Sequence, residues 1–265
     1  MSGERSVGAA IRAALLTAEP KAKVMAARAA ARDWRLGRLE CAFEEMPDEP
    51  ARPAEPELLP PNRMPKRGRG GSERGRIALW HSLAHIEFVA IDLALDMAGR
   101  FGGEMGPEFV GDFLHVAADE ALHFTLIERC LRTMNSRYGA LPAHDGLWQA
   151  ALETAHDVGA RLAVVPMVLE ARGLDVTPAT LARVRAQEDH RGERILQRIL
   201  DDEIRHVAIG AKHFGEIARI RGKDAESWWI ELVRRHFRGR LKPPFNDSAR
   251  SAAGLSLAAC ATLAS

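Results

Sequence analysis

Two Glu-x-x-His pairs constrain this chain more than any other feature of its sequence. The pairs are Glu120–His123 and Glu203–His206. Because positions i and i+3 lie on the same face of a helix, each pair can present a carboxylate and an imidazole in one direction. One such pair is common in proteins and would carry little weight alone. Two pairs in one chain indicate a repeated arrangement.

A lone glutamate precedes each pair by the same distance along the chain. Glu87 lies 33 positions before Glu120, and Glu170 lies 33 positions before Glu203. A duplicated helical hairpin would produce this equal offset. Di-iron and di-manganese carboxylate bundles take a single Glu from each of two helices and Glu-x-x-His from each of two others. The pattern therefore predicts a four-helix bundle that holds two metal ions in its core.

Each of the four glutamates lies in the middle of an apolar helical face. At about 100° per residue, Glu87 is surrounded by residues such as Trp80, Leu83 and Ile91, while four polar residues fall on the opposite side of the same helix. Those four are His81, His85, Asp92 and Asp96. A buried carboxylate is costly unless it is paired or bound to a metal. The candidate metal ligands are Glu87, Glu120, His123, Glu170, Glu203 and His206. The alternative is that they form ordinary buried ion pairs, or that some of them face water.

The composition is that of an ordinary soluble protein. Hydrophobic residues make up 46% of the 265 residues and charged residues 28%. A formal net charge of +1 gives no overall attraction to nucleic acid or to a membrane. The three cysteines have no metal-type spacing, and the N-terminal residues lack the layout of a signal peptide. No uninterrupted apolar run reaches the ~18–20 residues that span a bilayer. We therefore expect a cytoplasmic protein with no membrane partner.

Composition also divides the chain into four expected segments. They are an N-terminal helical appendage at 1–45, an extended Pro/Gly/Arg-rich linker at 46–74, a four-helix bundle at 75–221, and a C-terminal helix and tail at 222–265 packed on the bundle. The appendage should contain two helices divided at Pro20, because proline disfavours a helical conformation in the residue before it. The linker cannot form a regular helix because of its frequent prolines.

Within the bundle, helices are expected at about 75–100, 107–136, 145–172 and 191–221, and a further helix follows at 223–237. The third bundle helix would stop at Gly173, which leaves Glu170 near its end, and Thr177 would cap a separate short helix. Pro166 lies one turn before Glu170 and cannot donate a backbone hydrogen bond to Leu162. A kink beside the metal site and a simple packing irregularity are both consistent with this proline.

Motifs spread over most of the chain carry a resemblance to a known family. They are Pro-Lys-Arg at 65–67, His-Ile-Glu at 85–87, Ala-Ile-Asp at 90–92, Asp-Glu-Ala-Leu-His at 119–123, Val-Pro at 165–166, Leu-Glu-Ala-Arg-Gly-Leu-Asp-Val-Thr-Pro at 169–178, Asp-Glu-Ile-Arg-His-Val at 202–207, Leu-Lys at 241–242 and Pro-Phe-Asn at 244–246. With these motifs the chain resembles a bacterial ferritin-like family of unknown function (domain-of-unknown-function family four-fifty-five), which looks related to the di-iron hydroxylases that modify tRNA. The resemblance implies an all-α, ferritin-like bundle whose ligands map onto the same six residues. It implies no particular substrate.

The ligand set favours a non-haem di-iron protein, with manganese as the alternative at one or both positions, because carboxylates and imidazoles suit these ions. The expected function is that of an oxidase or hydroxylase, with dioxygen and an electron donor as partners and a small molecule or tRNA as substrate. A tRNA substrate would contact the basic stretches 66–76 and 234–242. Asp119 and Asp202 each precede a ligand glutamate and could accept hydrogen bonds from ligand imidazoles. The alternative is that these two are solvated helix charges.

Two other functions fit the same sequence. Iron storage or detoxification with ferroxidase chemistry would use the same ligands, although the long linker and the terminal helices are not typical of a minimal cage-forming subunit. A metal-free helical scaffold would use none of them. The metal content of the purified protein separates the three, because the enzyme would hold a fixed two ions per chain.

Overall fold

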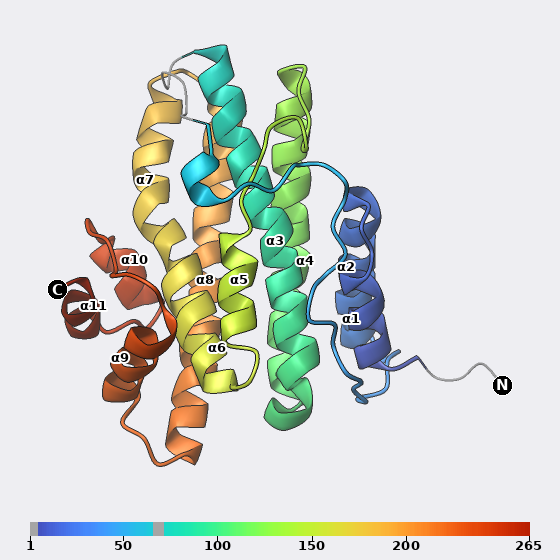
Figure 1. The fold of residues 1–265 in the computed structure, drawn as a ribbon, viewed down its shortest axis with the longest axis vertical. Helices are drawn as coiled ribbons and strands as arrows, with labels where there is room; N and C mark the ends of the chain where they lie inside the picture. Colours follow the sequence, from blue (N-terminus) through green and yellow to red (C-terminus); the bar gives the residue numbers. More distant parts are fainter. Residues whose placement is uncertain (1–4, 66–71) are drawn as a thin grey trace. The chain divides into compact units, whose positions relative to one another are not determined.

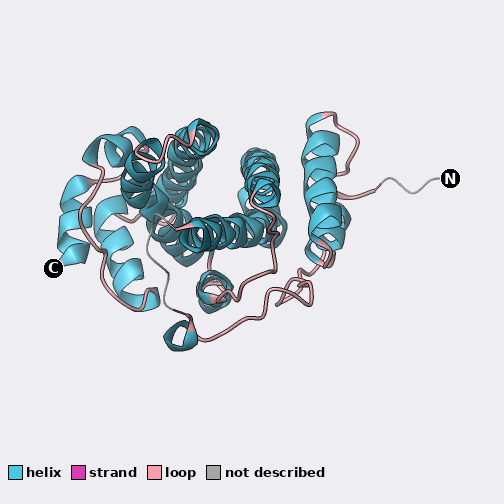
Figure 2. Cartoon of the chain, turned by 90° about the horizontal axis from the view of Figure 1, so that it is seen from above, coloured by secondary structure: helices cyan, strands magenta, loops and turns pink. Residues whose placement is uncertain are grey.

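The structure, a computed structural model, describes residues 5–65 and 72–265. Within these residues the regular secondary structure is helical and no β-strand occurs, so the predicted all-α fold is confirmed (Figure 1 and Figure 2). The chain forms two compact units, Met1–Trp148 and Gln149–Ser265. The four-segment division expected from composition stays a prediction.

The first unit is built around a long helical hairpin. Its elements are α1 (Val7–Leu15), α2 (Pro20–Arg35), the 3-10 turn η1 (Pro61–Arg63), α3 (Glu73–Met105) and α4 (Pro107–Thr133). The expected division at Pro20 is confirmed, and the Glu19 side chain caps α2 by accepting two backbone N–H groups of its first turn. The hairpin of α3 and α4 turns at Gly106, whose φ of 89° lies in the region that glycine adopts without strain. Pro107 follows in the first turn of α4, where its missing N–H leaves no hydrogen bond unmade.

The helix α3 is buried on both of its sides. The four polar residues opposite Glu87, namely His81, His85, Asp92 and Asp96, are each at most 6% exposed. Lys23 of α2 and Arg52 of the linker both contact Asp92 there. Lys23 Nζ lies 2.5 Å from Oδ1 of Asp92, and Arg52 Nη1 lies 2.9 Å from Oδ2. By length and composition α3 could cross a membrane, but 67% of its apolar stretch is buried inside the protein, as in the core helix of a soluble protein.

The described part of the linker, residues 46–65, is extended apart from η1, as predicted. Backbone hydrogen bonds attach it to the loop that leads from α4 to α5 (Gly146–Glu153). Leu59 N donates to Ala143 O at 2.8 Å, and Ala143 N donates to Glu57 O at 2.9 Å. The linker therefore holds residues 134–145 in place. Part of the basic stretch 66–76 lies outside the described residues, because these stop at 65 and resume at 72.

His81 of α3 holds the same loop from the other side. Its Nε2 accepts the backbone N–H of Gly139 at 3.0 Å and that of Leu141 at 3.3 Å. A neutral imidazole that accepts at Nε2 carries its proton on Nδ1. The side chain is 2% exposed, and burial lowers the pKa of His81 to about 4.

Replacing His81 with Gln should therefore remove part of the acid sensitivity of the metal-free protein. The unfolded chain binds a proton at this residue near pH 6.5, whereas the native ring stays neutral down to about pH 4. Its contribution to stability is fully present above pH 6.5 and is lost as the pH falls toward 4, by on the order of 3 kcal/mol. A Gln side chain keeps an oxygen acceptor but binds no proton. Urea unfolding of both proteins at neutral and acidic pH measures the difference, and an equal loss of stability in both would contradict it.

The second unit contains a long helical run with a π-helical segment in it, followed by further helices. Its elements are α6 (Val158–Val164), the π-helical segment η2 (Val165–Glu170), α7 (Ala171–Arg185), α8 (His190–Ile220), α9 (Ala225–His236), α10 (Asp247–Ala252) and α11 (Leu257–Ala264). The helices expected at 191–221 and 223–237 are confirmed as α8 and α9. The helix expected at 145–172 begins as predicted, with α5 at Gly146, but its continuity and its C-terminal end were predicted wrongly. It is interrupted at 154–157, and the run that begins at Val158 continues through Gly173 and Pro178 to Arg185 without a new cap at Thr177.

A distant side chain explains why α7 continues through Pro178. This proline has no N–H to donate to the carbonyl of Leu174. Asn246 Nδ2 donates to that carbonyl instead, at 3.1 Å. Arg250 holds the tail in position by two hydrogen bonds to Asp175, at 2.9 and 2.8 Å. The hydrogen bond that a proline removes from the helix is therefore supplied by the C-terminal tail.

The π-helical segment η2 coincides with Pro166, which cannot donate to the carbonyl of Leu162. The indole N–H of Trp229 on α9 donates to the carbonyl of Ala163 at 3.1 Å, directly before the distorted segment. The distortion is thus supported by a neighbouring helix. Segments of π-helix are rare and recur near functional sites, and this one ends at Glu170.

The four helices expected to carry the ligands pair within the units. In the first unit α3 packs against α4, and in the second unit the run from α6 to α7 packs against α8. The joining of the two pairs into one four-helix bundle stays a prediction.

Candidate metal centre

Three of the six predicted ligands converge in the first unit. Glu87 comes from the middle of α3, and Glu120 and His123 come from one face of α4. Their donor atoms lie within 4.8 Å of one another. His123 Nδ1 is 3.3 Å from Oε2 of Glu87 and 3.3 Å from Oε2 of Glu120. The spacing of three residues lets α4 alone align Glu120 with His123, and the hairpin adds Glu87.

These three side chains are removed from water. Glu87 is 3% exposed, and Glu120 and His123 are 0% exposed. Burial, and after it the charge of the nearby Glu120, raise the pKa of Glu87 well above its ordinary value, against the opposing contact with His123. Two carboxylates in a dry site resist carrying their charges together. A divalent cation removes that conflict because it neutralises both. The group is therefore a candidate metal-binding cluster.

The second Glu-x-x-His pair lies on the buried face of α8. Glu203 and His206 are one turn apart, with His206 Nδ1 at 3.8 Å from Oε2 of Glu203. His206 is 0% exposed and Glu203 is 9% exposed. The pair occupies the apolar stripe of its helix, as the sequence pattern indicated.

Glu170 lies in the interior of a helical run, so the expectation that it lies near the end of a helix is wrong. The contacts of residues before and after Glu170 show on which face of the helix it lies. A Cβ built on Gly210 of α8 would lie 2.4 Å from Pro166, and a Cβ built on Gly173 would lie 4.0 Å from Cγ of Glu203. Residues three and four apart share a helical face, so half-buried Glu170 lies on the side that packs against α8. Its role as a ligand stays a prediction.

The aspartates that precede two of the ligand glutamates have partners on their own helices. Asp119 Oδ2 lies 3.3 Å from Nε2 of the exposed His115. Asp202 pairs with Arg198 and, at 2.9 Å, with Arg205. These contacts place Asp119 beside an exposed histidine and Asp202 between two arginines of its own helix. Their predicted hydrogen bonds to ligand imidazoles stay a prediction.

The basic stretch 234–242 is partly engaged in ion pairs within the second unit. Arg235 lies 2.8 Å from Glu231, and Arg238 lies 2.8 Å from Glu153. Each pair reduces the positive charge available to a nucleic acid at that position. Contact with RNA through this stretch stays a prediction.

Sequence patterns did not single out a polar and aromatic cluster on the far side of α3 from Glu87. Its centre is Tyr138, whose hydroxyl lies 2.9 Å from Nδ1 of His85 and whose ring stacks on His81 at 5.6 Å. The available signal was the spacing of His81 and His85, which puts two histidines on one helical face. Their partner is 53 residues from His85, so local spacing could not reveal it.

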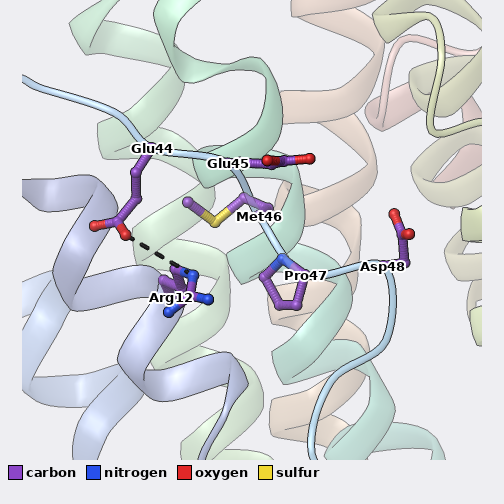
Figure 3. Close-up of a pocket in the computed structure, with 6 residues that line it drawn as sticks. All are labelled: Arg12, Glu44, Glu45, Met46, Pro47 and Asp48. Carbon is purple, nitrogen blue, oxygen red and sulfur yellow. Dashed lines mark ion pairs between the residues drawn. The ribbon is translucent and has the colours of Figure 1, made fainter.

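A surface cavity of about 420 Å³ lies elsewhere in the first unit (Figure 3). It is lined by Arg12, Glu44, Glu45, Met46, Pro47 and Asp48. Arg12 Nε lies 3.8 Å from Oε2 of Glu44. The three carboxylates of the lining are exposed, and the candidate ligands are not part of it. The cavity is therefore separate from the candidate metal centre.

The fold and the buried donors define a class: an all-α protein with a carboxylate–histidine cluster suited to a metal ion. Within that class the chain belongs to the DUF455 family, described as a protein of unknown function, which it matches over residues 16–261. The predicted family is thus confirmed. The chain is 43% identical over 209 residues to a protein of Haemophilus influenzae described as an uncharacterized protein, and the similarity covers 76% of this chain and 72% of that relative. No solved structure matches the chain.

Proposed function

We propose that the chain is a non-haem carboxylate protein with two metal ions, iron or iron and manganese, and that it acts as a dioxygen-dependent oxidase or hydroxylase. The observation that carries the proposal is the buried group of Glu87, Glu120 and His123. The second unit supplies Glu203 and His206, a pair of the same composition. In this proposal both groups, together with Glu170, serve one two-metal site of the kind found in di-iron carboxylate bundles.

The donor set fits the proposed ions. Carboxylate oxygens and imidazole nitrogens suit iron and manganese, whereas thiolates would favour zinc, copper or an iron–sulfur cluster. The donor group contains no cysteine. We include a cytoplasmic location in the proposal, since the sequence has three cysteines without a disulfide-type pattern.

The bound metal would supply the redox chemistry, with dioxygen and an electron donor as co-substrates. The residues of the chain have a different task, which is to hold the ligands in fixed directions and to exclude water. Phe88 and Phe124 directly follow Glu87 and His123, are buried, and have ring centroids 5.3 Å apart. Buried rings that follow the ligands in the sequence help to keep water out of this part of the core, which protects a reactive oxidant from side reactions.

Metal analysis of the freshly purified protein tests the ligand assignment. We expect two ions per chain in the wild type and the loss of at least one ion in Glu120→Ala and in Glu203→Ala. The matched controls Glu108→Ala and Asp201→Ala change exposed acidic residues on the same two helices and should keep both ions. A ratio far above two would indicate iron storage, and full metal content in both ligand variants would overturn the assignment.

Oxygen uptake by the same proteins tests the reaction class. Iron-loaded protein that is reduced without air and then mixed with oxygenated buffer should consume dioxygen, whereas Glu203→Ala should not. An absence of uptake by fully loaded wild type, with or without a reductant, would remove the oxidase and hydroxylase functions and leave a structural metal site.

A further inference from the structure

The chain has a single tyrosine, and this residue is buried beside the helices that carry the first three donors. Tyr138 is 7% exposed and follows α4 in the loop that the linker holds in place. Its hydroxyl lies 2.9 Å from Nδ1 of His85 on α3. A buried phenol with a base at hydrogen-bonding distance is able to lose an electron and a proton together.

The second nitrogen of His85 fixes the direction of this hydrogen bond. His85 Nε2 lies 3.1 Å from the backbone carbonyl of His144. A carbonyl only accepts hydrogen bonds, so Nε2 carries the ring proton, and the neutral imidazole has its free lone pair on Nδ1. The Tyr138 hydroxyl therefore donates to Nδ1 of His85. The phenolic proton already points at the atom that would receive it.

The hydrogen bond to His85 gives that proton a destination when Tyr138 is oxidised. Burial raises the pKa of Tyr138, so the hydroxyl stays protonated at every physiological pH. Loss of an electron alone would create a buried cation, which is costly in an apolar site. Transfer of the proton to Nδ1 of His85 as the electron leaves moves the positive charge from the oxidised phenol to the imidazole, which is a much stronger base.

Two aromatic rings connect Tyr138 to the ligand-bearing helices. Its ring centroid is 5.2 Å from that of Phe88 and 5.2 Å from that of Phe124, which it meets edge-on. Phe88 directly follows Glu87 in α3, and Phe124 directly follows His123 in α4. The Tyr138 ring thus directly contacts the two residues that follow candidate ligands in the sequence.

We propose that Tyr138 and His85 form a proton-coupled redox pair that delivers one electron to the oxidised metal centre. This inference rests on the proposed function, because the oxidant is the metal centre after its reaction with dioxygen. Tyr138 loses one electron, which reduces the metal centre by one equivalent, and the phenolic proton moves to Nδ1 of His85. The products are a neutral phenoxyl radical and an imidazolium. The external electron donor returns one electron to Tyr138, and the proton then goes back from His85.

Photo-oxidation of the metal-free protein tests the pair independently of the metal. A photogenerated one-electron oxidant should yield a tyrosyl radical. Growth on ring-deuterated tyrosine labels this residue alone. Deuteration should narrow the electron paramagnetic resonance spectrum of the radical, and this change assigns the signal to Tyr138. Oxidation should slow in heavy water and should slow on the order of a hundredfold in His85→Gln, which can accept a hydrogen bond but not a proton. His81→Gln is the control, since His81 stacks on Tyr138 without accepting its proton. The same rate in His85→Gln and wild type, without a solvent isotope effect, would overturn the pair.

Oxygenation of the iron-loaded, reduced protein tests the relay. We expect the deuterium-sensitive tyrosyl signal in wild type and its absence in Tyr138→Phe, with equal metal content in both. Oxygen uptake without any tyrosyl signal in wild type would overturn the relay while leaving the proposed function intact. An absence of oxygen uptake would overturn the proposed function and would also remove the metal centre as the oxidant. The photo-oxidation of the metal-free protein would still show whether Tyr138 and His85 form a redox pair.

Discussion

Removal of the bound metal is expected to lower the melting temperature of the wild-type protein, and to lower that of Glu87→Gln by less. A ligand that binds only the native state adds about 2.7 kcal/mol per ion when its free concentration is a hundredfold above its dissociation constant. Two ions would add about 5 kcal/mol, which corresponds to roughly 10–20 °C for a chain of this size. Melting curves before and after chelation, with metal removal verified by elemental analysis, measure the shift. Glu108→Ala should respond like the wild type, and an unchanged wild-type curve would contradict the expectation.

Without the metal, Glu87→Gln should be more stable than the wild type at alkaline pH, which is the reverse of their order with metal bound. The pKa of Glu87 is raised in the native state, so the native protein holds this proton more tightly than the unfolded chain does. The resulting stabilisation is present below the ordinary value of 4.5 and is lost as the pH rises through the raised value. In metal-free Glu87→Gln, the side chain at position 87 carries no charge that could repel Glu120. The variant should therefore be more stable than the metal-free wild type at alkaline pH, and the difference should close below pH 4.5.

Replacing Asp92 with Asn is expected to cost about 3–5 kcal/mol, the range seen when one partner of a buried ion pair is removed. Asp92 and Lys23 are both 0% exposed, and Arg52 Nη1 donates to the second carboxylate oxygen at 2.9 Å. The neutral amide would leave the Lys23 ammonium buried without a counter-charge at position 92, with only neutral acceptors such as the carbonyls of Leu15 and Ala51, at 3.3 and 3.1 Å. The midpoint of urea unfolding at neutral pH measures the loss.

Two further variants separate charge burial from a general effect of losing an aspartate. Asp33 pairs with Arg32 at the surface of α2, at 2.9 Å, and Asp33→Asn should shift the midpoint little. The double variant Lys23→Met with Asp92→Leu removes both buried charges, so it should recover much of the stability that Asp92→Asn loses. A double variant as unstable as Asp92→Asn would show that the cost does not arise from the uncompensated Lys23.

The elements that follow local rules were predictable from the sequence. The boundaries of α4 and α8 agree with their apolar periodicity, and Pro20 marks the division between α1 and α2. The end of α3 at Met105 was not predicted, because that helix continues beyond the expected end near residue 100. The continuation of α7 through Pro178 could not be predicted in this way. Its missing hydrogen bond is replaced by Asn246, which lies 72 residues beyond Leu174, so no local signal exists.

The candidate site shows the same division. Glu120 and His123 could be placed together because three residues of helix fix their relative position, and Glu87 joined them through the short hairpin turn. The burial of His81, His85 and Asp92 was not foreseen, because the partners that satisfy them lie in the linker, in α2 and in the loop after α4. A helical wheel describes which residues share a face, but not what covers that face.

The contact between Asn246 and Leu174 also sets an order of events during synthesis. Asn246 follows α8 in the chain, so it leaves the ribosome after both α7 and α8 have emerged. Until it arrives, the carbonyl of Leu174 lacks the donor that Pro178 cannot supply, and α7 is weakest one turn beyond Glu170. The helix that presents Glu170 is therefore completed late in translation. The proposed ligand role of Glu170 would then become available only after the tail has been synthesised.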